Sequence, residues 1–396
     1  MRTSNSQMSN TPAINAPVTV EPFSLVRVEA HVLRWPVKQP VQTSFGLMHD
    51  RPAVLVRAEA GDGTVGWGEV WCNFPACGAE HRARLLETVI EPLIVNQTFA
   101  CAEAAFAHMS ARTAVLAIQC GEPGPMAQVI AGVDLAIWDL LARRARLPLW
   151  SLLGGTSDKV HVYASGINPD RPQDMVAAKQ AEGYRAFKLK IGFGEQRDLD
   201  NTWAVRELLP DGAELMLDAN QAWDLATARH MVDRLGELAP AWLEEPLRAD
   251  RPISEWQQLA SSTNIPLAAG ENLIGTDAFE AMIGSGALRV VQPDLAKWGG
   301  VSGCLPVIQR IHETGLRYCP HFLGAGIGQL ASAHVLAARG RPGGMLEVDA
   351  NENPLRTVLS PAIGRICDGA VQLGSRPGLG IDPDIAELRK LCEMRP

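Results

Sequence analysis

YRAFKLKIGFGEQRDLDNTWAVRELLPDGAELMLD, residues 184–218, decides the fold of this chain. An apolar run that ends in Lys190 precedes a stretch with apolar residues at helical spacing, and a second apolar run then ends in Asp218. Parallel strands need a crossover of this kind, because a tight turn cannot join them. The segment therefore predicts one unit of strand, helix and strand.

The same unit repeats along the chain. A charged or ionisable residue closes a short apolar run at intervals of 28, 26, 27, 23, 27 and 26 residues. KVHVYAS at 159–165 supplies a first strand, so eight strands are expected in an α/β barrel whose strand C-termini meet at one mouth. The residues at those ends are Lys190, Asp218, Glu244, Glu271, Asp294, His321 and Glu347. Helices are expected at 172–183, 196–209, 224–236, 301–315 and 326–339.

The N-terminal third follows a different pattern. Residues 24–60 alternate apolar and polar positions and predict an antiparallel meander, and helical patterns follow it. Such a succession is typical of an α+β domain. We therefore expect a disordered tail at 1–22, a capping domain at 23–150, the barrel at 151–347 and a C-terminal segment at 348–396 that returns to the cap.

Composition limits the partners. The net charge of −8, without a cluster of Lys and Arg, argues against a nucleic-acid or anionic-membrane partner. The first 22 residues lack an apolar segment for export, and no apolar stretch reaches the ~20 residues of a membrane span. The eight cysteines show no repeated short spacing, which is typical of free thiols in a reducing compartment. We expect a cytoplasmic homo-oligomer that acts on a small molecule.

Three carboxylates end three successive strands: Asp218, Glu244 and Glu271. Their mutual repulsion is costly unless a cation joins them, and oxygen ligands suit Mg²⁺, with Mn²⁺ as an alternative. Each acid could instead cap the helix that follows it. Their register with the strand period, and Asn220 two residues after the first, favour the metal site.

Proton-transfer groups are expected beside these carboxylates. Lys188 and Lys190 share one face of a strand, and a nearby cation and a second ammonium would lower the pKa of Lys190 from ~10.4, so that it could act as a base. Asp294 and His321 end neighbouring strands, where the carboxylate can fix the imidazole tautomer. The alternatives are solvated surface lysines and a histidine packed in the core.

Seven motifs, taken in order, resemble the enolase superfamily in its mandelate racemase branch: KLK, LDAN, WLEEP, AAGEN, QPDLAKWGG, PHFLGAGIG and MLEVDANENPLR. The resemblance covers residues 24–396. It implies an α+β cap over a modified TIM barrel, (β/α)7β, that binds Mg²⁺ and removes the proton α to a carboxylate to give an enediolate. It also implies that Asp218, Glu244 and Glu271 are the ligands, Lys190 the base, Asp294 and His321 the dyad, and Glu347 an acid that hydrogen-bonds to the substrate.

Asp294 stands where the muconate-lactonizing branch has a catalytic lysine, and Lys297 is expected to be a cation at the rim. Lys188 and a protonated Glu347 would stabilise the enediolate together with the metal. A lyase that dehydrates an acid sugar is the first prediction. A lactone cycloisomerase, to which KIGFG and NPLR are also similar, and a racemase or epimerase of an α-hydroxy acid remain alternatives.

Two cap loops are expected to cover the mouth, TSFG at 43–46 and WCNF at 71–74. Their polar groups suit a mono- or diacid sugar of four to six carbons, with Arg51 as a bidentate carboxylate partner. The expected substrate contacts are Thr43, Ser44, His49, Arg51, Trp71, Asn73 and Asn220. Two other functions were weighed: a sugar-acid binder would lack a proton-transfer residue, and a divalent-metal aldolase would not need a dyad opposite a lysine.

Overall fold

The computed structural model describes residues 21–43 and 46–393. Most of the expected N-terminal tail, residues 1–20, therefore lies outside the described range. Four strands form the cap sheet, in the order β3-β2-β1-β4. They are β1 (Phe23–Thr43), β2 (Gly46–Ala60), β3 (Val65–Val70) and β4 (Thr98–Phe99). All of their pairings are antiparallel, so the alternating pattern of residues 24–60 does form the predicted meander.

Helices of the cap pack against this sheet: α1 (Gly78–Leu85), η1 (Leu86–Ile90), α2 (Glu91–Ile94), α3 (Ala102–Gln119) and α4 (Pro123–Arg144). Helix α4 lies so close to β3 that a Cβ at Gly66 or Gly68 would fall 2.2 Å and 2.0 Å from backbone oxygens of α4. Gly66 and Gly68 of β3 lack a Cβ, and this allows α4 to pack so closely against the strand. Within the described residues α4 is the one helix long and apolar enough to cross a membrane, and 89% of that window is buried inside the protein.

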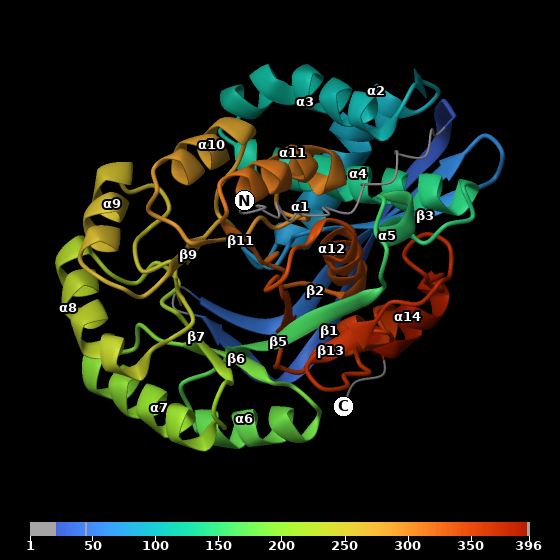
Figure 1. Cartoon of the computed structure of the whole chain (residues 1–396). Helices are drawn as coiled ribbons and strands as arrows, with labels where there is room; N and C mark the ends of the chain where they lie inside the picture. Colours follow the sequence, from blue (N-terminus) through green and yellow to red (C-terminus); the bar gives the residue numbers. More distant parts are fainter. Residues whose placement is uncertain (1–20, 44–45, 394–396) are drawn as a thin grey trace, which may run out of the picture.

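Eight parallel strands form the barrel sheet, in the order β11-β10-β9-β8-β7-β6-β5-β12. They are β5 (Lys159–Ile167), β6 (Ala186–Lys190), β7 (Glu214–Asp218), β8 (Leu243–Glu244), β9 (Leu267–Ala269), β10 (Val290–Val291), β11 (Arg317–Tyr318) and β12 (Leu346–Asp349). Figure 1 shows the helices that follow them as an outer ring. These are α6 (Pro172–Ala181), α7 (Glu195–Leu208), α8 (Leu225–Leu235), α9 (Ile253–Ser261), α10 (Thr276–Gly284), α11 (Gly300–Glu313) and α12 (Gly326–Arg339).

One buried layer takes a side chain from each of the eight strands or their immediate ends. It consists of Tyr163, Ala186, Met216, Trp242, Ala268, Val290, Cys319 and Met345, and none of them is more than 8% exposed. Large and small side chains interdigitate here, as they do in the interior of a TIM barrel. This layer, which we call the barrel floor, closes the interior below the functional side chains.

The remaining short elements are α5 (Leu149–Leu152), η2 (Gly236–Leu238), α13 (Pro354–Leu359), β13 (Ala370–Gln372) and α14 (Ile385–Glu393). Strand β13 pairs antiparallel with β5, whereas α14 packs against β1 of the cap. The fold class, a modified TIM barrel with an N-terminal α+β domain, is as predicted. The predicted helices begin and end within two residues of the observed ones, but the sequence analysis missed α9 and α10.

Candidate active site

Strand register brings the first functional groups together. Lys190 on β6 pairs with Asp218 on β7, and Asp218 pairs with Glu244 on β8. The last positions of three adjacent strands are therefore direct neighbours. Glu271 follows the end of β9 by two residues, and Asp294 and His321 each follow the end of their strand by three. The side chains that the sequence period singled out thus gather at the C-terminal end of the barrel.

Lys188 stands at the centre of this group and is fully buried. Its Nζ donates to Glu244 Oε1 at 2.6 Å and lies 2.8 Å from Glu347 Oε1 and 3.7 Å from Asp218 Oδ2. Burial alone would lower the pKa of Lys188, but the charges of Glu244 and Glu347 outweigh it and hold the pKa well above its usual value. Lys188 is therefore a fixed positive charge among carboxylates.

Lys190 is paired with a predicted metal ligand. Its Nζ donates to Asp218 Oδ2 at 2.6 Å. Burial lowers the pKa of Lys190, but Asp218 and Glu244 together raise it, and the net shift is upward. The same contact lowers the pKa of Asp218 against the effect of its burial. The expected lowering of the lysine pKa concerns Lys190 beside a bound cation and stays a prediction; with Asp218 facing the ammonium, the pKa of Lys190 is raised.

Glu244 is held by two residues that the sequence analysis did not identify. Gln292 Nε2 donates to Glu244 Oε2 at 2.6 Å, and Trp242 Nε1 donates to the same oxygen at 3.2 Å. Burial raises the pKa of Glu244 to about 7 even with Lys188 beside it. The Oε1 atom of Gln292 is buried without a hydrogen-bond partner. Both side chains point into the interior just below the strand ends, where only a structure distinguishes them from core residues.

The dyad is present in the predicted form. His321 Nδ1 lies 2.7 Å from Asp294 Oδ2, and His321 Nε2 lies 2.9 Å from Glu271 Oε2. The backbone N–H groups of Ala296 and Lys297 donate to Asp294 Oδ1 at 2.8 and 3.1 Å, which fixes the carboxylate. Burial lowers the pKa of His321, but the neighbouring carboxylates, Glu271 foremost, hold it well above its usual value. The neighbouring carboxylates thus favour the charged imidazole, and the contact with Asp294 orients the ring.

Lys297, expected at the rim, lies inside the group. Its Nζ is 3.1 Å from Glu271 Oε2 and donates to Asn272 Oδ1 at 2.9 Å. The ammonium also stands 4.8 Å from the centre of the Trp71 ring, an arrangement that favours a cation–π contact. Together with His321 it lowers the pKa of Glu271 well below its usual value, although burial acts in the opposite direction.

Glu347 ends the sequence of functional groups on β12. Its carboxylate accepts from Ser165 Oγ and, at 3.3 Å, from the backbone N–H of Phe322. Burial raises the pKa of Glu347, but Lys188 and His321 lower it below its usual value. A protonated Glu347, which its role in stabilising the enediolate would require, stays a prediction, and Lys188 and His321 oppose it.

The carboxylates outnumber the cations that face them. Asp218, Glu244, Glu271, Asp294 and Glu347 are joined by Glu245, which is 1% exposed and accepts from Asn272 Nδ2 at 2.9 Å. Among the residues that the structure describes, the cations that oppose these six acids are Lys188, Lys190, Lys297 and His321. Burial and the nearby Glu271 raise the pKa of Glu245 well above its usual value. Such a surplus of oxygen donors fits a hard divalent cation.

The carboxylate oxygens of the predicted metal ligands do not meet at one point. Within residues 21–43 and 46–393, no three Asp, Glu, His or Cys side chains are arranged so that they could hold a metal ion as they stand. The physical reason is that each predicted ligand is turned toward a cation of the chain: Asp218 to Lys190, Glu244 to Lys188, and Glu271 to His321 and Lys297. The donor chemistry fits Mg²⁺, and binding would require these three carboxylates to turn.

The seven predicted substrate contacts differ in their surroundings. Ser44 and the side chain of Thr43 lie outside the described part of the chain. Arg51 is 3% exposed and forms an ion pair with Asp349, so its guanidinium is already engaged. Asn73 Nδ2 donates to the backbone oxygen of Leu323 at 2.6 Å, next to the dyad. The remaining three are His49, exposed on β2, Trp71, beneath Lys297, and Asn220, whose Nδ2 donates to Asp218 Oδ2.

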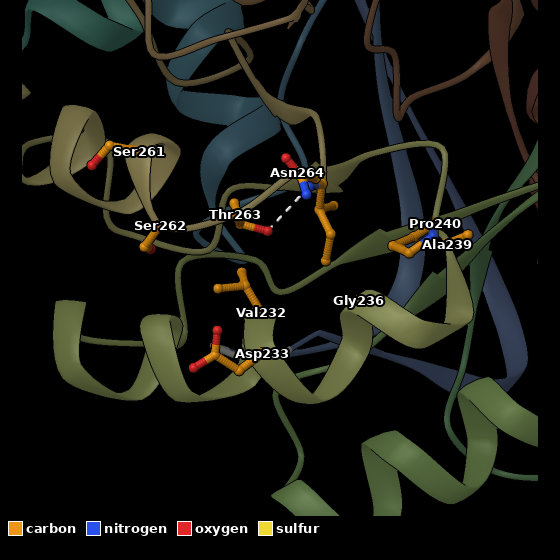
Figure 2. A pocket seen from close by; sticks show the side chains of 10 residues that line it. Val232, Asp233, Gly236, Ala239, Pro240, Ser261, Ser262, Thr263 and Asn264 are labelled. Atoms are coloured by element: carbon orange, nitrogen blue, oxygen red, sulfur yellow. Dashed lines mark hydrogen bonds between the residues drawn. The ribbon is translucent and has the colours of Figure 1, made fainter.

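A cavity of about 630 Å³ lies away from these groups. It is bounded by the end of α8 and by the segments that lead into β8 and β9, among them Pro240, Ser262 and Thr263 (Figure 2). Those segments precede their strands, so the cavity is at the end of the barrel opposite the acidic group. The cavity is not a candidate active site, because Asp233 is the one ionisable residue among the described residues that line it.

Family comparisons cover nearly the whole chain. The sequence model described as mandelate racemase / muconate lactonizing enzyme, N-terminal domain, matches residues 26–154, and the model described as enolase C-terminal domain-like matches residues 173–388. The chain is 30% identical to D-galactarolactone cycloisomerase of Agrobacterium fabrum, covering 91% of this chain and 96% of that protein. It is 27% identical to arabinonate dehydratase of Saccharolobus solfataricus, covering 84% and 88%.

Solved structures give the same result. A mandelate racemase/muconate lactonizing enzyme from Bordetella bronchiseptica RB50 superimposes with a TM-score of 0.90 at 60% identity, covering 94% of this chain and 100% of that chain. A racemase from Streptomyces coelicolor A3(2), whose crystal structure has bound magnesium, superimposes with a TM-score of 0.82 at 26% identity, covering 93% and 99%.

Proposed function

The chain belongs to the mandelate racemase and muconate lactonizing enzyme family of the enolase superfamily, and from this premise we propose that it dehydrates a sugar acid by removing the proton α to the carboxylate. The observation that carries the proposal is the pair of proton-transfer groups beside one acidic cluster. Lys190 contacts Asp218, and His321 contacts Glu271. Relatives named as dehydratases and cycloisomerases support this class of reaction.

Asp218, Glu244 and Glu271 would hold a divalent cation, Mg²⁺ in our proposal. The cation would supply positive charge to the substrate carboxylate. Lys188 adds a second fixed charge, since its Nζ is buried among the same carboxylates, and such preorganised charge is the term that stabilises a developing enediolate most. Glu347 contacts both Lys188 and Ser165. These contacts restrict the position of the Lys188 ammonium relative to the substrate.

Lys190 is the proposed base. With Asp218 engaged as a ligand, burial and the like charge of Lys188 remain to lower the pKa of Lys190, both of which favour the neutral amine. The amine then takes the proton from C2 of the substrate, and the electron pair of that C–H bond is left on the enediolate. Lys190 ends β6 and His321 follows β11, and strands β7, β8, β9 and β10 lie between those two strands in the sheet, so the two side chains can act on different sides of one substrate.

His321 is the proposed acid. Its neighbours favour the charged imidazole, which can give a proton to the C3 hydroxyl as the C3–O bond breaks. Water leaves, the enediolate electrons form the C2–C3 double bond, and the resulting enol gains a proton at C3 to give a 2-keto-3-deoxy acid. Asp294 retains the imidazole orientation throughout, because two backbone N–H groups fix its other oxygen.

The test is a screen of the purified chain with Mg²⁺ or Mn²⁺ against arabinonate, galactonate, galactarate and their lactones. We expect a 2-keto-3-deoxy acid that carries deuterium at C3 when the reaction is run in D₂O, and deuterium at C2 of the recovered substrate. A His321→Asn variant should lose dehydration and keep exchange at C2, whereas a Lys190→Met variant should lose both. Turnover confined to aryl α-hydroxy acids or N-acyl amino acids would overturn the proposal of a sugar acid.

A lactone cycloisomerase is the second candidate, favoured by the 30% identity to D-galactarolactone cycloisomerase. The same base would remove the proton α to the free carboxylate of the lactone, and the ring oxygen on the β carbon would leave in place of a hydroxyl, which opens the ring to a carboxylate. The two candidates give different products, since cycloisomerisation conserves the molecular formula and dehydration releases water. Mass spectrometry of the product mixture separates them.

A further inference from the structure

A carboxylate of the cap is inserted into the loop that carries the dyad histidine. Glu69 on β3 is 2% exposed, and its two oxygens accept from different backbone N–H groups of that loop. Ala325 N donates to Oε1 at 2.5 Å, and Gly328 N donates to Oε2 at 2.8 Å. Both donors belong to the first turn of α12, the helix that follows His321, where N–H groups have no partner within the helix.

The contact reaches the histidine through one aromatic ring. Phe322, next in sequence to His321, is 1% exposed. A Cβ at Gly324 would lie 2.6 Å from the Phe322 ring and 2.8 Å from Glu69 Oε1, and a Cβ at Gly328 would lie 2.3 Å from the same ring. The residues that Glu69 touches are thus packed directly on Phe322. Movement of the first turn of α12 would displace the residue that adjoins the imidazole.

A second side chain of the cap fixes the same loop. Asn73 Nδ2 donates to Leu323 O at 2.6 Å, between His321 and the residues bound by Glu69. On the barrel side, Asn353 Nδ2 donates to Gly324 O at 2.8 Å. The loop 321–328 is therefore held by polar contacts from two separate segments, of which the cap supplies Glu69 and Asn73.

A second carboxylate of the cap binds the first turn of the helix that follows Asp294, the other residue of the dyad. Asp134 on α4 accepts from Ser302 N at 3.0 Å and from Ser302 Oγ at 2.6 Å, in the first turn of α11, which follows the loop of Asp294. A buried carboxylate is costly unless its hydrogen bonds are satisfied. Burial raises the pKa of Glu69 to about 7, with a further contribution from the nearby charge of Asp294. Glu69 therefore holds the loop 321–328 through hydrogen bonds as well as through packing.

We propose that Glu69 is a positioning residue for His321, and that through Glu69 and Asn73 the cap sets the orientation of the dyad imidazole against Asp294. The role given to His321 rests on the proposed function. Glu69 itself touches no reacting atom and acts only through the loop 321–328. The loop of Lys190 is independent of this contact, because Asp198 on α7 fixes it from the barrel side through Gly192 N and Phe193 N at 2.8 and 3.1 Å.

The proposal is tested on the full chain labelled with ¹⁵N-histidine, with and without Mg²⁺. The ring ¹⁵N signals of His321 are assigned by their loss in His321→Asn. Glu69→Gln presents one acceptor and one NH₂ donor to two backbone donors, so amide exchange in residues 322–330 should quicken about tenfold or more. We expect the His321 ring signals to shift or broaden in Glu69→Gln and in Asn73→Leu, and to remain unchanged in the matched control Asp198→Asn.

Unchanged His321 signals in a folded Glu69→Gln whose 322–330 amides exchange faster would overturn the proposal, since the loop would then move without the imidazole. Should Glu69→Gln fail to fold, the same comparison between Asn73→Leu and Asp198→Asn decides the question. None of these signals requires turnover. A failed search for sugar-acid substrates would therefore count against the proposed function alone.

Discussion

Lys190 Nζ lies 2.6 Å from Asp218 Oδ2, so the proposed base and a proposed metal ligand neutralise each other. Two consequences follow from this ion pair. The lysine cannot serve as a base until Asp218 has another positive partner, and a cation that binds Asp218 must compete with an ammonium already in place. Catalytic competence and metal binding are thereby joined in one contact.

Asp218→Asn should weaken Mg²⁺ binding about tenfold or more and abolish deuterium uptake at C2, because an amide is a poorer ligand than a carboxylate. Isothermal titration calorimetry measures the affinity. Glu214→Gln is the matched control on the same strand, since Glu214 begins β7 and pairs with Arg317 at 2.9 Å, at the opposite end of the barrel. Equal Mg²⁺ affinities of the two variants would remove Asp218 from the metal site.

Asp294→Asn should lower turnover by about 10² or more and leave the fold intact. The asparagine oxygen can still accept from Ala296 N and Lys297 N, but its NH₂ group would face His321 Nδ1 and favour the wrong tautomer. Steady-state kinetics give the loss in turnover, and far-UV circular dichroism checks the fold. Near-normal turnover would return His321 to the status of a buried structural histidine.

Asp134 provides a test of stability against pH. Burial raises the pKa of Asp134 to about 7 from 3.8, although hydrogen bonds from Ser302 lower it. Between these two values the folded chain binds more protons at this site than the unfolded chain. The contribution of Asp134 to the free energy of unfolding is therefore greatest below pH ~4 and decreases as the pH rises toward 7. Above that value the loss is complete, and it amounts to about 1.4 kcal/mol for each pH unit crossed.

Asp134→Asn should remove this contribution. Urea unfolding at pH 4, 5.5 and 7.5 measures the free energy of unfolding of both proteins. We expect the variant to gain stability relative to the natural chain as the pH rises, whereas the contributions of other buried acids, such as Glu69 and Asp139, cancel in the difference. A difference that is constant with pH would show that Asp134 titrates as it does in the unfolded chain.

Gly328→Ala should destabilise the fold by roughly 1–3 kcal/mol, as expected of overpacking in a rigid interior. The added Cβ would lie 2.3 Å from the Phe322 ring. Gly284→Ala is the matched control: Gly284 also lies in a helix, α10, and a Cβ there meets no atom within 4 Å. That change should be neutral or stabilising by up to about 1 kcal/mol. Urea unfolding distinguishes the two, and equal effects would contradict the tight packing of the loop 321–328.

The strand period was sufficient to predict the barrel and the order of its functional groups. Lys190, Asp218 and Glu244 lie at the ends of adjacent strands because consecutive units of a barrel are neighbours in space. The dyad followed from the same rule. Sequence spacing alone therefore determined which side chains share the mouth, without any information on their hydrogen bonds.

Contacts between the cap and the barrel were beyond that reasoning. Glu69 meets Gly328 across 259 positions of the chain, and Arg51 meets Asp349 across 298. Periodicity carries no information on such pairs, so it predicts neither the ion pair of Arg51 with Asp349 nor the contact of Glu69 with Gly328. The pKa of Lys190 in this structure is beyond such reasoning as well, because it depends on whether the Asp218 side chain faces the ammonium.

The barrel floor makes the active site a cul-de-sac. Met216, Trp242 and Cys319, with the five other side chains of that layer, leave no route through the axis of the barrel. Every molecule that enters at the mouth must also depart there, so a product still in place denies access to the next substrate. Competition between product and substrate for this one opening therefore follows from the architecture.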